Sequence, residues 1–127
     1  MTHNDLPDAV CDILESLDPP IELPVFVGEY PTDLDNCIAV WLDDAANISF
    51  FGQTDALGIP LIRFMIRTED YVPGNDAAKR LVQVFKNTYS NGKDEIALSP
   101  IGTTQYMGKD ENGRHEFRLN YKSIIKE

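Results

Sequence analysis

Residues 61–68 alternate between apolar side chains and side chains that are mostly basic. This period of two is typical of a β-strand with two different faces. One face would carry Ile62, Phe64 and Ile66, and the other Arg63, Met65 and Arg67. The pattern therefore predicts a strand from Leu61 to Thr68 with its apolar face in a core and its other face positively charged.

Further strands are expected on both sides of this one. The continuous apolar run Cys37–Leu42 predicts a strand buried on both faces, and Val25–Val27 predicts a short strand inside a proline-rich, acidic connector over 19–36. Residues 45–60 are expected to form a strand end or a mobile loop. Pro100 makes the strand 95–101 an edge or a bulged strand.

A hairpin is expected near the C-terminus. Asn112-Gly113 is a strong hairpin signal between the strands 103–108 and 114–124. The second of these strands also alternates. It carries Phe117, Leu119 and Tyr121 on one face and Arg118, Asn120 and Lys122 on the other.

Two amphipathic helices complete the expected elements. The first spans about 5–17 and ends before Pro19-Pro20, and the second spans about 76–89 after a cap at Asn75. Packing both apolar stripes on one side of the strands gives the predicted fold. It is a single α+β domain over 1–127, with an antiparallel or mixed sheet of about four to six strands and both helices on one face.

The charge is distributed very unevenly along the chain. The net charge is −10; residues 1–62 contain twelve Asp and Glu but no Lys or Arg, whereas residues 63–127 contain all eleven basic residues and nine acidic ones. The two parts therefore carry −12 and +2. This balance argues against sequence-specific or non-specific nucleic-acid binding and against anionic membrane surfaces as partners.

No catalytic or metal-binding motif emerges from the sequence. His3 and His115 lack neighbours at ligand spacing, and Asp43-Asp44 and Asp110-Glu111 do not match the EF-hand pattern. Cys11 and Cys37 are expected to be reduced and buried. We therefore expect no enzyme activity, no cofactor and no metal site.

Two charged surfaces are the candidate functional features. Basic residues on the non-core faces of the two alternating strands would form a stripe of Arg63, Arg67, Arg118 and Lys122. The first helix would carry an acidic face of Asp8, Asp12 and Glu15. Both surfaces have a simpler interpretation as solvated polar faces. The alternative is that the stripe of one copy contacts the acidic face of the next, in a head-to-tail contact that closes into a ring. On that hypothesis, reversing Arg63 and Arg67 to Glu weakens assembly and leaves the fold intact.

The order of several segments resembles the family of tailed-bacteriophage minor capsid and tail terminator proteins. The segments are Asp35-Asn36-Cys37-Ile38-Ala39-Val40, Ile62–Thr68 with Asp70-Tyr71, the helix from Ala77 to Tyr89, Ile101-Gly102, and Gly108–Phe117 with Leu119-Asn120-Tyr121. The resemblance covers about 35–123 and leaves out the first 34 residues.

Membership of that family would imply a ring, commonly of six copies, that caps the tail tube, stops its polymerisation and joins the tail to the head. The implied partners are further copies of the chain, the tail tube protein and the head–tail connector protein. The implied locations are the head–tail joint of the virion and, during assembly, the host cytoplasm. The alternative from another class is an acidic binding module, such as an immunity protein or an inhibitor of a basic partner.

Overall fold

The computed structural model describes residues 6–17, 20–29, 32–42, 61–85, 88–90 and 95–126. The predictions for 45–60 and for Asp43-Asp44 lie outside these residues. The elements are α1 (Leu6–Glu15), β1 (Val25–Val27), β2 (Cys37–Leu42), β3 (Leu61–Thr68), α2 (Tyr71–Val84), β4 (Thr88–Ser90), β5 (Glu95–Pro100), β6 (Gln105–Lys109) and β7 (His115–Lys126). Neither described helix has the length and apolar character needed to span a membrane.

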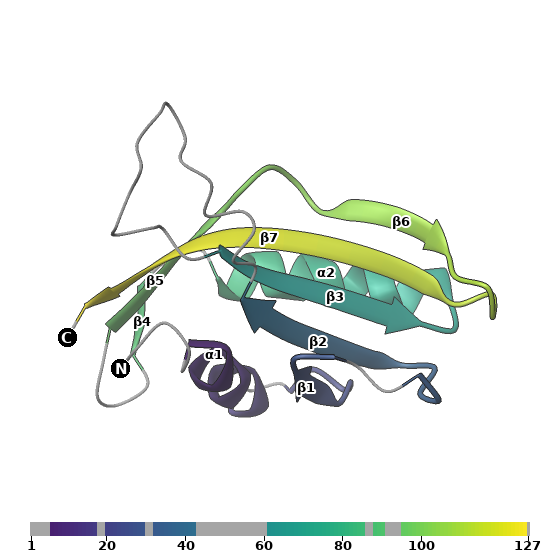
Figure 1. Cartoon of the computed structure of the whole chain (residues 1–127), viewed down its shortest axis with the longest axis horizontal. Coiled ribbons are helices and arrows are strands. Elements are labelled where there is room, and N and C mark those ends of the chain that lie inside the picture. The colour runs from purple at the N-terminus through teal and green to yellow at the C-terminus, as the bar shows by residue number, and fades with distance from the viewer. Residues whose placement is uncertain are drawn as a thin grey trace.

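The strands form one mixed sheet in the order β1-β2-β3-β7-β5-β4. β1 and β2 are parallel, and every other pair is antiparallel. The long strand β7 pairs with β6 through its first residues and with β5 through its later ones, so β5 and β6 follow one another along the same edge (Figure 1). The main path has six strands, within the predicted range of about four to six, and β6 adds a seventh.

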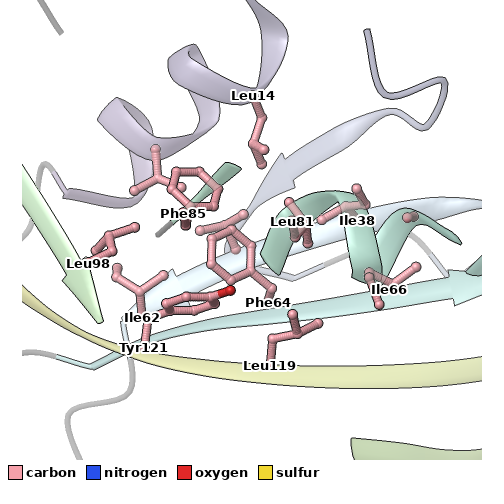
Figure 2. Close-up of a cluster of buried hydrophobic side chains, with 14 of the residues drawn as sticks. Leu14, Ile38, Ile62, Phe64, Ile66, Leu81, Phe85, Leu98, Leu119 and Tyr121 are labelled. Atoms are coloured by element: carbon pink, nitrogen blue, oxygen red, sulfur yellow. The ribbon is translucent and has the colours of Figure 1, made fainter. Parts of the chain in front are cut away.

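Both helices pack on the same face of this sheet, which confirms the predicted α+β arrangement. The alternating apolar residues of β2, β3 and β7 lie in register there, so that Val40, Phe64 and Leu119 form one row across the three strands. Figure 2 shows Phe85, at the end of α2, close to Phe64 and Tyr121. The Phe64 ring centroid lies 5.4 Å from each of these two rings. Burial of such aromatic rings provides much of the stabilisation of a core this size.

The second helix begins earlier and ends earlier than predicted. It starts at Tyr71 after the extended residue Asp70. Pro73 permits this start, because a proline in the first turn lacks only an N–H that would have no partner within the helix. The prediction of a cap at Asn75 is therefore wrong. The helix ends before Phe85, whose ψ of 60° is not helical, and Tyr89 belongs to β4 instead.

Gly74, inside α2, lies close against the sheet. A Cβ on this residue would lie 2.5 Å from a carbon of the buried Phe117 ring and would also clash with the Thr68 hydroxyl. Only glycine allows the helix to pass at this distance from β3 and β7.

Candidate assembly surfaces

The outer face of α1 carries the three acidic residues expected from the sequence. Leu6, Val10 and Leu14 are buried against β1 and β2, whereas Asp8, Asp12 and Glu15 are exposed on the opposite side of the helix. We call these three residues the acidic face.

Beside the acidic face, Cys11 is held as a neutral thiol. Its Sγ donates a hydrogen bond to Glu15 Oε1 at 3.0 Å. Burial, with this hydrogen bond and the negative charge of Glu15, raises the pKa of Cys11 to about 12. Cys11 and Cys37 are both free and buried, as predicted.

The side of β2, β3 and β7 that faces away from both helices is called here the open face. The register of β3 and β7 brings Arg63, Arg118 and Lys122 together on it, since these residues pair with Asn120, Met65 and Leu61 respectively. Arg63 Nε donates to Asn120 Oδ1 at 2.9 Å, and Arg118 Nε donates to Gln105 Oε1 at 3.0 Å. These three basic residues are half-buried or exposed, and we call them the basic face.

Arg67 belongs to the same side of the sheet but not to its accessible charge. Only 5% of the residue is exposed, and its Nη1 donates to the carbonyl oxygen of Leu34 at 2.9 Å. Its Nε lies 3.9 Å from Asp110 Oδ2 and 4.0 Å from Glu116 Oε2. A glutamate at position 67 would meet both of these carboxylates. Reversal of Arg67, predicted from the sequence to spare the fold, is therefore expected to disrupt it.

A second buried arginine completes this arrangement. Arg114, 7% exposed, donates from Nη1 to the carbonyl oxygens of Thr32 and Leu34 at 2.9 and 3.0 Å. Its Nε donates to Asp110 Oδ2 at 2.8 Å. Arg67, Arg114 and Asp110 are called the arginine anchor, because together they tie the segment before β2 to the β6–β7 hairpin.

Asp110 also organises the hairpin turn itself. Its Oδ1 accepts hydrogen bonds from the backbone N–H groups of Asn112 and Arg114, both at 2.9 Å. Desolvation by itself would raise the pKa of this carboxyl, but the hydrogen bonds from Arg114 and Asn112 and the Arg114 charge outweigh it, so the pKa of Asp110 lies below its usual value.

Sequence reasoning missed an aromatic cluster at the base of the same hairpin. The Tyr71 and Tyr106 rings lie with centroids 5.3 Å apart, and each lies 5.2 to 5.8 Å from the rings of His115 and Phe117. Tyr106 Oη and His115 Nδ1 form a 2.7 Å hydrogen bond. Tyr106 lies opposite Phe117 because the register shifts between Tyr106 and Gly108, and counting residue pairs outward from the predicted turn does not reveal this shift. No sequence signal links Tyr71 to them.

The cavities and the groups of metal-binding side chains among the described residues give little support for a catalytic or metal-binding site. One hollow of about 500 Å³ lies between α2 and the turn that precedes β6, with Lys79, Val82 and Ile101 in its wall. Within the described ranges, no three His, Cys, Asp or Glu side chains are grouped as they would be around a metal ion.

Comparison with known proteins assigns the chain to a family. No curated protein matches it. The family model described as bacteriophage tail terminator protein matches residues 5–127, which extends the similarity seen over 35–123 through the first helix as well. The family is structural rather than enzymatic. Since this match spans nearly the whole chain, the protein belongs to the bacteriophage tail terminator family.

Proposed function

We propose that this protein forms a ring at the top of the phage tail tube, stops polymerisation of the tube, and joins the tail to the head connector. The observation that carries this proposal is the family match over residues 5–127. The ring, of six copies as the family resemblance implies, acts at the head–tail joint of the virion after assembly in the host cytoplasm.

The placement of charge supports a role in assembly. The acidic face lies on the helix side of the sheet and the basic face on the open side, so the two cannot meet within one molecule. Each is available to a different neighbour, as a head-to-tail assembly requires. We propose that the partners of this protein in the virion are further copies of the chain, the tail tube protein and the connector protein.

Electron microscopy of phage particles tests the proposal. Loss of the gene is expected to give tail tubes of uncontrolled length without attached heads, and supply of the protein in trans restores tails of one length joined to heads. Normal, head-joined tails in the deletion strain would contradict the proposal. Capture of a basic host protein in a tight complex by the purified protein would favour the acidic binding module instead.

Charge reversal tests the basic face separately. Lys122→Glu is expected to lower the yield of capped tails, because it places a carboxylate among groups that meet a negative surface. Lys79→Glu makes the same change on the exposed side of α2 and is the matched control. Equal yields from both variants would remove the basic face from the docking surfaces.

A further inference from the structure

Among the strands that the structure describes, one on each side of the sheet has an edge with no strand partner. Within the described residues, β1 pairs only with β2, and β6 pairs only with β7. Unpaired strand edges present rows of N–H and C=O groups that readily accept another strand. Both edges also expose apolar side chains: Val27 on β1 is 44% exposed, and Tyr106 and Met107 on β6 are each 46% exposed.

The two edges lie at the same level of the sheet. The registers place Val25, Ile38, Ile66, Phe117 and Tyr106 in one row, and Phe26, Ala39, Met65, Arg118 and Gln105 in the next. Each row crosses β1, β2, β3, β7 and β6. Figure 1 shows β1 and β6 at opposite sides of the three strands between them. A second molecule placed beside the first at the same height would therefore present β1 directly to β6.

The strand directions fit such a contact. β1 and β2 run the same way, and the three antiparallel steps from β2 through β3 and β7 to β6 leave β6 running opposite to β1. Two copies in the same orientation would thus pair β6 with β1 antiparallel. Antiparallel pairing is slightly the more stable mode, and a contact between two different edges is head-to-tail.

The charges beside the two edges are complementary. β1 lies between the exposed acids Glu22 and Glu29, whereas β6 ends in the exposed Lys109 and has Arg118 beside it on β7. Lys109 lies just beyond the row that contains Val25. Glu22 precedes β1 on this same side of the row. In the antiparallel contact, called here the seam, Lys109 of one copy and Glu22 of the next come to the same end. The acid that follows Lys109, Asp110, is already paired with Arg114.

We propose that the occupant of each edge is a second copy of this chain, with β6 of one copy pairing antiparallel with β1 of the next. This inference rests on the ring of the proposed function and names its subunit interface. In a ring joined this way, the acidic and basic faces of neighbouring copies stay on opposite sides of the extended sheet. They do not contact each other and are left for the tail tube and connector proteins.

A disulfide test on assembled tails decides between this seam and other contacts. Phe26 and Gln105 occupy the same row at the two edges, so Phe26→Cys with Gln105→Cys places two thiols opposite each other across the seam. Under mild oxidation, tails of normal length carrying both substitutions are expected to give a ladder of covalent oligomers on a non-reducing gel. Phe26→Cys combined with Lys79→Cys is the control and gives no ladder.

Capped tails without a ladder would overturn the proposed seam while leaving the terminator function intact. Tails of uncontrolled length even with the unaltered protein would instead count against the proposed function.

An independent measurement covers the case in which the cysteine variant fails to assemble. Val27→Asp and Met107→Asp are each expected to weaken self-association at least tenfold by sedimentation or native mass spectrometry, with unchanged circular dichroism. Ile101→Asp places the same charge on an exposed apolar residue outside both edges and should leave association unchanged. Equal association by all three variants would overturn the seam.

Discussion

The open face of the sheet has two ends that look alike in sequence and differ in structure. Arg63 and Arg67 lie four residues apart on the same strand and the same side, yet Arg67 is buried and Arg63 remains partly accessible. The difference lies in what crosses above them. Residues 32–34 supply carbonyl oxygens to Arg67 and Arg114 at one end, whereas Arg63 pairs with Asn120 in its own sheet at the other. The alternating pattern therefore identifies which residues share a face of the sheet. Contacts with residues 32–34 determine which of these charged residues are buried and help to hold the fold together.

Among the substitutions that test this difference, removal of the Arg114 side chain should lower the unfolding free energy most. Arg114→Ala deletes the hydrogen bonds to two carbonyl oxygens and to Asp110, so polar groups in the anchor lose their partner. We expect a loss of about 3 kcal/mol or more in unfolding free energy, as for breaking one side of a buried ion pair. Urea denaturation followed by circular dichroism measures it. A loss below about 1 kcal/mol would show that the anchor is dispensable.

Lowering the pH should weaken the arginine anchor at one end of the open face before it affects the contact of Arg63 with Asn120 at the other end. Because the folded-state pKa of Asp110 lies below its usual value, the ionised carboxylate contributes stability that is present above the unfolded pKa, near 3.8, and is lost as the pH falls through the lower folded value. Wild-type protein should therefore lose more unfolding free energy between about pH 6 and about pH 3 than Asp110→Asn does. Denaturation curves at both pH values provide the measurement, and parallel losses would contradict the assignment.

The accessible end should tolerate the same kind of truncation that the anchored end does not. Arg63→Ala removes the hydrogen bond to Asn120 from a half-buried position, and we expect a cost of about 1 kcal/mol or less. The same urea experiment applies, with Arg114→Ala as the reference. A loss as large as that of Arg114→Ala would erase the distinction between the two ends.

The difference between Arg63 and Arg67 also shows which features of the fold can be predicted from the sequence alone. The period of two and the apolar run predicted β2 and β3 with their observed bounds, and the side-chain alternation predicted which residues of β3 and β7 share a face. These features depend on local geometry. The burial of Arg67 does not, because its partners Leu34 and Asp110 are distant in sequence and on opposite sides of it along the chain.

The bounds predicted for the second helix were wrong for a similar reason. The acidic, proline-containing stretch 69–74 is typical of a turn, but the sheet beneath it allows the helix to start at Tyr71, where the ring of this residue packs on Phe117. β4 was missed because a three-residue strand carries almost no periodic signal; only its pairing with β5 defines it.

The parallel pairing of β1 and β2 has a consequence for the order in which the molecule forms. β1 can meet β2 as soon as the first third of the chain exists, because only residues 28–36 separate them. The segment between them is fastened by Arg114, whose partner Thr32 lies 82 residues earlier. On the ribosome, this connection must therefore wait until Arg114 has been synthesised, after β1, β2, β3 and α2, so residues 32–34 are fastened later than the strands beside them are formed.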